Sequence, residues 1–559
     1  MPYRAPVSDI SFCLENVVGF DRVQGTELFA EASTDLVQAM LTEAGRICEE
    51  VIAPLNRDGD LHPAKLENGV VRTSPGFAEG YRALAEAGFT GISADPEYGG
   101  LGLPHTVTTA VNEMIGSACL SLQLNPLMTQ GQIEALEHHA TDEIKALYLP
   151  KLTSGEWCGT MNLTEPQAGS DVGALTTKAE PKGDGTYAIS GQKIYISWGD
   201  NDFAENIVHL VLARLPDAPA GTKGISLFLV PKKLPDADGN PGVANDLKVV
   251  SLEHKMGLHG SPTCVMQYDG ATGWLIGAEN KGMAAMFTMM NNARLGVGVQ
   301  GLSIAEAAYQ HALAYALDRK QGRTGGGTGM IVDHADVRRM LMEMKAETFA
   351  ARALCLDLAV SIDLAKTGDD QAAARAAFLT PIAKAYGTET GIKVANTGIQ
   401  VHGGMGFIEE TGAAQFARDV RVTAIYEGTN GIQAMDLAGR KLMDGGDAAF
   451  ALLDEIAATE SDFADTIRPM VDALRKTTED MLARDMADRF GGAVPFLMAY
   501  ARVLGAHYHA KAAASGDATR KALAQFFITR LLPEAQALMA QARCGTDGLY
   551  DLSPDDLAA

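Results

Sequence analysis

The chain lacks the cysteine patterns of a disulfide scaffold or a zinc protein. Its seven cysteines are scattered, with no C-x-x-C pair and no His/Cys cluster: Cys13, Cys48, Cys119, Cys158, Cys264, Cys355 and Cys544. An odd, unclustered set indicates free thiols in a reducing compartment and shows no zinc site. No apolar run approaches the length that spans a membrane, and Met1–Arg4 lack a signal-type apolar core. These absences predict a cytoplasmic protein without a membrane partner.

Basic residues are also fewer than acidic ones. The chain has 46 basic and 70 acidic residues, which gives a formal net charge of −24. Non-specific nucleic-acid binding needs a basic face, so this charge argues against it, although local lysines and arginines can still oppose a phosphate. No strand–GxGxxG–helix unit occurs, so a nicotinamide-binding Rossmann site is not expected. The glycine-rich stretch Gly322–Gly329 has no lysine at P-loop spacing, and we interpret it as a flexible connector.

Length and pattern predict several domains in one chain. A length of 559 residues suggests about four domains, and 47% hydrophobic with 21% charged residues describes a soluble globular protein with a large core. Local patterns divide the chain into residues 1–157, 158–279, 280–445 and 446–559. The first is predicted to be a helical N-terminal domain, the second a β-domain, the third a helical bundle, and the fourth an additional helical domain.

The first segment shows helical spacing. Apolar residues recur at this spacing from Leu36 to Val51, after the capping candidates Ser33–Asp35, and Pro54 is predicted to end that helix. The glycine-rich stretch Pro96–Gly102 is interpreted as a turn, and a further helical region is predicted over residues 112–148.

The pattern changes near Gly159 to short β-rich runs separated by Gly, Pro, Asp and Asn. These runs cover residues 187–197, 207–213, 225–230, 247–252 and 264–268. Together they predict a compact antiparallel β-domain.

Helical periodicity returns near residue 280. The predicted helices cover residues 281–319, 334–367, 371–398 and 413–420, and a last one starts near Thr429 and ends before Asp444. Beyond Gly446 the chain is again helical and shows no catalytic pattern, which favours packing or oligomer contact as the role of that segment.

Glu427 is the leading candidate for a general base. It follows the apolar run Val422–Ile425 and precedes Gly428 and the pair Thr429–Asn430, which can cap the next helix. Apolar surroundings disfavour ionisation and raise a carboxyl pKa, which makes a better base than a solvated glutamate. Taken alone, this position favours instead a cap or a helix-dipole partner, the commoner role of a glutamate beside a helix start.

Three other motifs favour the catalytic role of Glu427 over the capping role. Thr164–Asp171 offers hydroxyls, backbone N–H groups and a glycine to a polar, planar ligand with a polyol or phosphate tail. Together with Arg319–Gln321, Gln400–Phe407 and Tyr426–Thr429, in this order, it resembles the acyl-CoA dehydrogenase family. The resemblance spans roughly residues 30–445, and the ordered set is far more specific than any single motif.

The resemblance implies an α+β fold, with a helical N-terminal domain, a central antiparallel β-domain and a helical bundle, to which this chain adds a C-terminal helical segment. It also implies FAD held between the β-domain and the bundle. The residues that match flavin contacts are Met161, Leu163, Thr164, Tyr195 and Ser197, and Ser170 matches a contact to flavin or to the CoA pantetheine. The residues that match FAD diphosphate or adenosine contacts are Arg319, Gln321, Gln400, Gly403, Gly404 and Thr429.

The chain departs from the family pattern at two of these sites. Tyr195 replaces the common tryptophan, and Gly322 replaces the phenylalanine that often follows the Arg-x-Gln triplet. Arg294 matches an arginine on the CoA side of the substrate site.

The implied reaction is dehydrogenation of an acyl-CoA thioester to the 2-enoyl-CoA. Glu427 would take the α-proton while the β-hydrogen leaves as hydride to flavin N5. The backbone N–H of Glu427 and a flavin ribityl hydroxyl would stabilise the enolate oxygen. An electron-transfer flavoprotein is expected as the electron acceptor, and a homodimer or a dimer of dimers as the assembly.

The extra C-terminal segment resembles the longer members of the family, which include the bacterial 3-methylmercaptopropionyl-CoA dehydrogenases of dimethylsulfoniopropionate breakdown. This predicts a short acyl chain, with 3-methylmercaptopropionyl-CoA first and butyryl-CoA next. Four methionines repeat at near-helical spacing just before Arg294: Met283, Met286, Met289 and Met290. Core filling is the favoured interpretation, and a ligand-facing set would suit a thioether chain.

Other functions share parts of this pattern. An acyl-CoA oxidase has the same flavin and base but lets oxygen reach the reduced flavin, and a medium- or long-chain acyl-CoA dehydrogenase differs in pocket depth. An alkylation-response flavoprotein that binds DNA is disfavoured by the charge of −24. A purely structural helical protein is disfavoured by the motif set.

Overall fold

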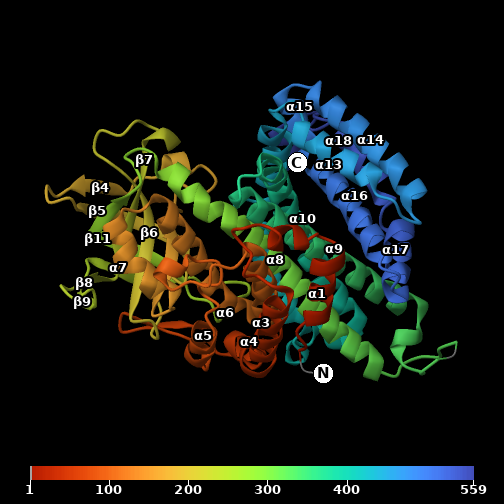
Figure 1. The fold of residues 1–559 in the computed structure, drawn as a ribbon, viewed down its shortest axis with the longest axis horizontal. Coiled ribbons are helices and arrows are strands. Elements are labelled where there is room, and N and C mark those ends of the chain that lie inside the picture. Colours follow the sequence, from red (N-terminus) through yellow and green to blue (C-terminus); the bar gives the residue numbers. More distant parts are fainter. Residues whose placement is uncertain (1–2, 326) are drawn as a thin grey trace. The chain divides into compact units, whose positions relative to one another are not determined.

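The computed structural model describes residues 3–325 and 327–559 (Figure 1). Met1 and Pro2, within the stretch Met1–Arg4, and Gly326, within the connector Gly322–Gly329, lie outside the described residues. The chain forms two compact units, one made of residues 39–293 and the other of residues 3–38 and 294–559. Within the described ranges, no helix is both long enough and apolar enough to cross a membrane.

The unit of residues 39–293 is built on a seven-stranded sheet with the order β10-β11-β5-β4-β6-β3, in which β7 pairs with β11 and β6 (Figure 1). The strands are β3 Trp157–Asn162, β4 Lys178–Pro181, β5 Tyr187–Ser197, β6 Asn206–Arg214, β7 Ile225–Pro231, β10 Leu247–Leu252 and β11 Thr263–Ile276. Most pairs are antiparallel, whereas β6 pairs in parallel with β3 and, at one position, with β4. Two small hairpins add β1 Lys65–Glu67 with β2 Val70–Arg72, and β8 Lys233–Pro235 with β9 Pro241–Ala244.

All five predicted strands are present. Strands β3 and β4 of the sheet and the four short hairpin strands β1, β2, β8 and β9 were not predicted. Every residue of β3 is buried, and its sequence mixes Gly159, Thr160 and Asn162 with apolar residues, so it is not the mainly apolar run by which the equally buried β6 and β7 were predicted. Its Gly159 lies so close to the side chain of Gln132 that a Cβ atom there would overlap the Gln132 Oε1 atom. The close contact between β3 and the helix that carries Gln132 therefore requires a glycine.

Helices pack around this sheet. They are α4 Ala53–Leu61, α5 Phe77–Glu86, α6 His105–His139 and α7 Asp142–Thr153, preceded by α3 Thr34–Ile47 and a π-helical turn over Cys48–Ile52. Helix α6 is buried over most of its length, packs against β3, and departs from helical backbone angles at Cys119. Pro96–Tyr98 forms a single 3₁₀ turn, in agreement with the predicted turn.

The prediction that Pro54 ends the first helix is wrong. The chain continues as α4 to Leu61, and Pro54 occupies its first turn. A proline is tolerated there because its missing N–H would have no helical partner at that position. The wider turn over Cys48–Ile52 comes directly before it, and such turns often occur where a helix accommodates an irregularity.

The unit of residues 3–38 and 294–559 is helical (Figure 1). The helices that contribute to it are α1 Val7–Asn16, α2 Asp21–Gln24, α8 Gly282–Asp318 from Arg294 onwards, α9 Ala335–Lys366, α10 Asp370–His402, α11 Ala413–Val420, α12 Asn430–Ala438, α13 Asp447–Ala458, α14 Ala464–Leu482, α15 Met486–Gly491, α16 Ala493–Ala513, α17 Ala518–Arg530, α18 Glu534–Ala542 and α19 Pro554–Ala558. The predicted helical regions of this part of the chain are confirmed to within a few residues, apart from the last, because α12 ends at Ala438 and only a short 3₁₀ turn follows it.

Helices α8 and α10 approach each other at backbone distance. A Cβ atom on Gly298 or Gly301 of α8 would overlap the backbone of Ala383 or Gly387 in α10, and a Cβ on Gly387 would overlap Gly298. These glycines let the two helices pack closely, which brings Lys384 of α10 into the interior of the unit.

Buried charged groups join the last segment to α9 and α10. Glu347 of α9 is 1% exposed and accepts hydrogen bonds from Arg502 of α16 at 2.7 Å to each oxygen, from Lys393 at 3.0 Å and from Tyr386 at 2.5 Å. Arg502 also donates to Glu534 of α18 at 2.7 Å. Burial acts to raise the pKa of Glu347, but the cations Arg502 and Lys393 outweigh it and lower this pKa to about 2.

A second buried group repeats this arrangement further along α9. Asp357 accepts hydrogen bonds from Arg375 of α10 and from the hydroxyl of Tyr508 of α16, each at 2.6 Å. Arg375 in turn reaches Glu455 of α13 at 2.5 Å. Because each buried charge has its partner on another helix, these pairs set the register in which residues 446–559 pack on the bundle.

We expect Arg502→Met to destabilise this unit strongly. The change leaves the buried Glu347 carboxylate short of its main partner, and breaking a buried pair in this way costs about 3–5 kcal/mol. Lys476→Met is the matched control, since Lys476 is exposed on α14 and its pairs with Glu479 and Asp480 are worth less than about 1 kcal/mol. Thermal and denaturant midpoints should fall clearly for the first variant and stay near the original for the second. Equal midpoints for both would show that the buried pair does not hold the segment.

Candidate functional site

Glu427 lies in a strained turn just before α12. A 3₁₀ turn over Arg421–Ala424 leads into it, and Glu427 and Gly428 both have left-handed backbone angles, with φ of 54° and 83°. A non-glycine residue in this region costs of order 1–3 kcal/mol and is often found at functional sites. The following residue, Thr429, caps α12: its Oγ1 accepts a hydrogen bond from the N–H of Ile432 at 3.2 Å. The predicted cap is therefore confirmed for Thr429.

Neighbouring side chains hold the turn from both sides. Gln433 of α12 is fully buried, and its Nε2 donates to the backbone oxygen of Glu427 at 3.2 Å and to that of Gly428 at 3.4 Å. The hydroxyl of Tyr426 donates to Oε1 of Gln300, a buried residue of α8. These bonds compensate for the strained backbone and fix where the Glu427 side chain starts.

The pKa of the Glu427 carboxyl group lies near neutral pH. The residue is half-buried, and among the described residues no hydrogen bond reaches its carboxyl oxygens. Burial raises the pKa of Glu427 to about 7, while the nearby cations Arg294 and Lys384 act in the opposite direction. A carboxyl with such a pKa is mostly ionised at slightly alkaline pH and is a far stronger base than a solvated glutamate.

Two buried cations face this turn. Arg294 of α8 is 7% exposed, and its Nη1 lies 3.7 Å from Oδ2 of Asp436 in α12. Lys384 of α10 is fully buried, and its ammonium donates to Asn430 Oδ1 at 2.9 Å. Arg294 was predicted from the sequence as a site residue, whereas Lys384 was not. The signal for it was present, because Lys384 is the only charged residue of the apolar stretch Phe378–Tyr386.

The residues that match diphosphate contacts gather at the ends of α8 and α10. The ring of His402 stacks on that of Tyr315, with 4.4 Å between the centroids, so the two helix ends lie together. The predicted residues here are exposed: Arg319, Gln321, Gln400, Gly403 and Gly404. A Cβ atom on either glycine would meet nothing within 4 Å, and Gly403 has φ of 59°. This open backbone beside an arginine suits a phosphate ligand.

The predicted flavin contacts lie together in the unit of residues 39–293. The N–H of Ile194 donates to the oxygen of Thr164 at 2.9 Å, and Oγ1 of Thr160 donates to the oxygen of Ser197 at 2.9 Å. These bonds place Met161, Leu163 and Thr164, at the end of β3, beside Tyr195 and Ser197 of β5. Tyr195 is 62% exposed and has φ of 61°, so its ring is available for stacking.

The Thr164–Asp171 motif is held by one buried ion pair. Glu165 Oε1 lies 2.8 Å from Nζ of the fully buried Lys193, and its two oxygens also accept from the N–H groups and hydroxyls of Thr176 and Thr177. Burial acts to raise the pKa of Glu165, but Lys193 and these donors lower it to about 2. The carboxylate thus fixes the loop as a rigid element, while Ser170 further along it is exposed.

The methionine repeat divides into two kinds of position. Met286 and Met289 are fully buried in the core that also contains Met128 and Met161. Met283 and Met290 are partly buried at the edge of the same core. Core filling is therefore confirmed for Met286 and Met289.

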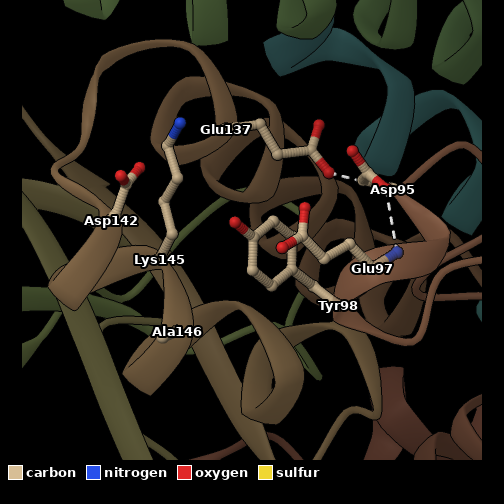
Figure 2. A pocket seen from close by; sticks show the side chains of 7 residues that line it. All are labelled: Asp95, Glu97, Tyr98, Glu137, Asp142, Lys145 and Ala146. Carbon is tan, nitrogen blue, oxygen red and sulfur yellow. Dashed lines mark hydrogen bonds between the residues drawn. The ribbon is translucent and has the colours of Figure 1, made fainter.

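A hollow of about 520 Å³ in this unit contains none of the predicted site residues. Figure 2 shows its lining, which comes from the turn at Pro96–Tyr98 and from the adjoining ends of α6 and α7. The charged lining consists of the carboxylates of Asp95, Glu97, Glu137 and Asp142 and the single cation Lys145. Such a lining repels the phosphates of a dinucleotide or a coenzyme A thioester, so the hollow is not a site for either ligand.

Comparison with protein families matches nearly the whole chain. Residues 34–156 match "Acyl-CoA dehydrogenase, N-terminal domain", 160–271 the middle domain and 280–442 the C-terminal domain of that family. Residues 449–553 match "Acetyl-CoA dehydrogenase C-terminal like".

Individual proteins show the same relationship. The chain is 48% identical over 520 residues to the 3-methylmercaptopropionyl-CoA dehydrogenase of Ruegeria pomeroyi, covering 89% of this chain and 88% of that protein. It is 36% identical over 511 residues to a butyryl-CoA dehydrogenase of Syntrophomonas wolfei, covering 86% and 84%. The structure of Caenorhabditis elegans ACDH-11 in complex with C11-CoA has the same fold, with a TM-score of 0.79, 20% identity and coverage of 98% and 96%. The α+β fold with extra C-terminal helices is confirmed, and the chain belongs to the acyl-CoA dehydrogenase family of oxidoreductases.

Proposed function

We propose that this enzyme catalyses the FAD-dependent α,β-dehydrogenation of a short-chain acyl-CoA thioester to the 2-enoyl-CoA, with Glu427 as the base that removes the α-proton. The observation that carries the proposal is the Glu427 carboxyl, which is held in a strained turn and has a pKa raised by burial to about 7. A residue that only capped a helix would need neither the strain nor the raised pKa.

The residues present fit FAD by their chemistry. Tyr195 offers an exposed ring beside Met161, Leu163, Thr164 and Ser197. A separate exposed group offers an arginine, two glutamines and an open glycine pair to a diphosphate: Arg319, Gln321, Gln400, Gly403 and Gly404. We assign Thr429 to the diphosphate as well, and Ser170 to flavin or pantetheine. When bound, FAD supplies the acceptor for the hydride that leaves the β-carbon.

The turn at Glu427 offers two groups to a thioester. Its carboxylate takes the α-proton, which requires the ionised form and hence a pH near or above 7. Among the described residues, the backbone N–H of Glu427 has no hydrogen-bond acceptor, so it can donate to the thioester oxygen as negative charge develops there. Arg294, a buried cation of the same region, is assigned to the CoA side of the substrate.

The substrate is proposed from two observations. The relative from Ruegeria pomeroyi carries the name 3-methylmercaptopropionyl-CoA dehydrogenase, and the alignment with it covers 89% of this chain. Met283 and Met290 are only partly buried, and their thioethers can contact the sulfur of such an acyl chain. We propose 3-methylmercaptopropionyl-CoA as the first substrate and butyryl-CoA as the second, with an electron-transfer flavoprotein as acceptor and a homodimer or dimer of dimers as the assembly.

The first expected outcome concerns the cofactor. The purified protein should be yellow and release one FAD per chain on denaturation. Arg319→Ala should lower FAD retention, because alanine cannot replace the bidentate contact of a guanidinium with a diphosphate. Arg339→Ala, which removes an exposed arginine of α9 that pairs with Asp336, is the control and should keep full occupancy. A colourless protein that gains no flavin spectrum on incubation with FAD would contradict the proposal.

The second expected outcome concerns the base. Glu427→Gln should retain FAD and bind acyl-CoA, while reduction of the flavin by substrate falls by at least roughly 10²–10⁴-fold. In the original enzyme the rate should rise with pH through about 7, because only the ionised carboxyl accepts a proton. Glu410→Gln, at an exposed carboxylate of the same region, is the control. Anaerobic stopped-flow absorbance measures the bleaching, and an unchanged rate in Glu427→Gln would remove this residue from the mechanism.

The third expected outcome concerns acyl length. A panel of saturated acyl-CoAs, with 3-methylmercaptopropionyl-CoA included, should give the highest kcat/KM for the short members. Each methylene that a pocket buries contributes about 0.8 kcal/mol, so a deep pocket would instead show kcat/KM rising steadily with chain length. Highest kcat/KM with a long chain would contradict the substrate proposal and leave the class of reaction intact.

A further inference from the structure

Lys384 is buried in a way that ordinary helix packing does not require. It lies on α10, is fully buried, and its ammonium donates to one neutral acceptor, Asn430 Oδ1, at 2.9 Å. Among the described residues it forms no ion pair with a carboxylate. Burial of an ammonium without a paired anion is costly, and it lowers the pKa of Lys384 to about 8.

The contact ties the Glu427 turn to α10. Asn430 is the first residue of α12 and comes three positions after Glu427. Its Nδ2 donates to Thr388 Oγ1 at 3.0 Å and to Glu389 Oε1 at 2.7 Å, so α10 holds the amide from both ends. The amide oxygen that completes this arrangement is the acceptor of Lys384. The lysine thus helps to set where α12, and with it the turn, begins.

The positive charge of Lys384 favours the ionised form of the half-buried Glu427 carboxyl. The two carboxylates that attract Lys384 are Glu427 and, more weakly, Glu389, while Arg294 repels it. Lys384 in turn is one of two cations that favour ionisation of Glu427, and Arg294 is the other.

The other charged groups of this region are largely paired. On α12, Asp436 forms two hydrogen bonds with Arg440, at 2.7 and 2.9 Å, and also faces Arg294 at 3.7 Å. Lys441 lies beside this group, where burial lowers its pKa. Burial raises the pKa of Tyr426, next to Glu427, so the phenol stays neutral. Replacing Lys384 therefore removes a positive charge near Glu427 and leaves Arg294, the arginine assigned to the substrate, unchanged.

We propose that Lys384 is a positioning residue for the Glu427 base: through Asn430 it holds the turn, and its buried charge keeps the Glu427 carboxyl ionised at the pH where the enzyme works. This inference rests on the proposed function of Glu427 as the base. It adds that the buried ammonium, which does not contact the reacting atoms, sets the pH range of the reaction.

The sign of the effect follows from the charge. Lys384→Met removes a cation near Glu427, so the neutral carboxyl becomes more favourable and the pKa of Glu427 rises. The pH midpoint for flavin reduction should therefore move up by about one unit, which makes the variant about tenfold slower below its midpoint. Well above both midpoints the rates of original and variant should converge, because the Glu427 carboxyl is then ionised in both proteins.

The experiment measures flavin reduction by butyryl-CoA against pH in the FAD-loaded enzyme, and in parallel the infrared band of the protonated carboxyl in the protein without substrate. The band is assigned by its loss in Glu427→Gln. Lys384→Met should move both midpoints up together. Lys384→Gln, which keeps a hydrogen-bond donor for Asn430 but no charge, should do the same and serves if Lys384→Met does not fold. The control Lys393→Met removes a lysine further along α10 that pairs with Glu343 and Glu347, and should leave both midpoints in place.

The possible results distinguish a positioning role of Lys384 from a purely structural one. If Glu427→Gln abolishes reduction and both Lys384 variants keep the original midpoint, with the rate lowered equally at every pH, Lys384 is a structural residue and the inference is wrong. If Glu427→Gln reduces flavin at the original rate, the proposed base falls and the inference falls with it. A midpoint that moves up in the Lys384 variants and not in Lys393→Met supports the inference.

Discussion

The proposed chemistry depends on keeping one carboxyl group, that of Glu427, partly out of water without a direct ion pair. Glu427 would lose its basicity if a guanidinium bonded it closely, and would lose the raised pKa if it were fully solvated. The two nearby cations contact other groups instead. Arg294 faces the carboxylate of Asp436, and Lys384 donates a hydrogen bond to Asn430. The result is a carboxyl that has positive charge nearby but no bond that would have to break before it accepts a proton.

Helix α10 connects this site to the rest of its unit. Its glycine contacts with α8 allow the close approach that buries Lys384, and its C-terminal end carries Gly403 and Gly404. Near its middle, Tyr386 and Lys393 bond the Glu347 carboxylate that also receives Arg502. Lys384 beside the proposed base, the glycines predicted to contact the cofactor, and the residues that bond the last segment thus lie on α10 or directly after it, so a shift of α10 would affect all three.

The sequence predicted the regular elements well wherever side chains alternate or repeat. Strand β5 was predicted at its observed limits, and the cap at Thr429 followed from its residue type. Strand β3 was not predicted because Gly159, Thr160 and Asn162 interrupt its apolar residues, whereas the equally buried β6 and β7 are mainly apolar runs. Pro54 was misread because a proline ends a helix in most contexts, whereas here it begins one.

The site was predictable only in part, because some of its residues lie close together in the sequence and others do not. Glu427 could be named because its apolar neighbours and the motif around it lie close in the sequence. Lys384 contributes through a contact with Asn430, 46 residues further along the chain, and its place in an apolar stretch does not indicate which turn it contacts. Gln433 follows Glu427 by six residues, but a glutamine inside a helix gives no sign that its amide bonds the backbone of the preceding turn.

The buried pairs on α9 make the last segment depend on the bundle more than the bundle depends on the segment. Glu347 and Asp357 receive Arg502 and Tyr508 from helix α16, so a chain cut after residue 445 would lose these two partners and keep Lys393, Tyr386 and Arg375 of α10. Water would then solvate both carboxylates, so the acids on α9 are compatible with the absence of the segment, whereas the buried Arg502 of the segment depends on Glu347.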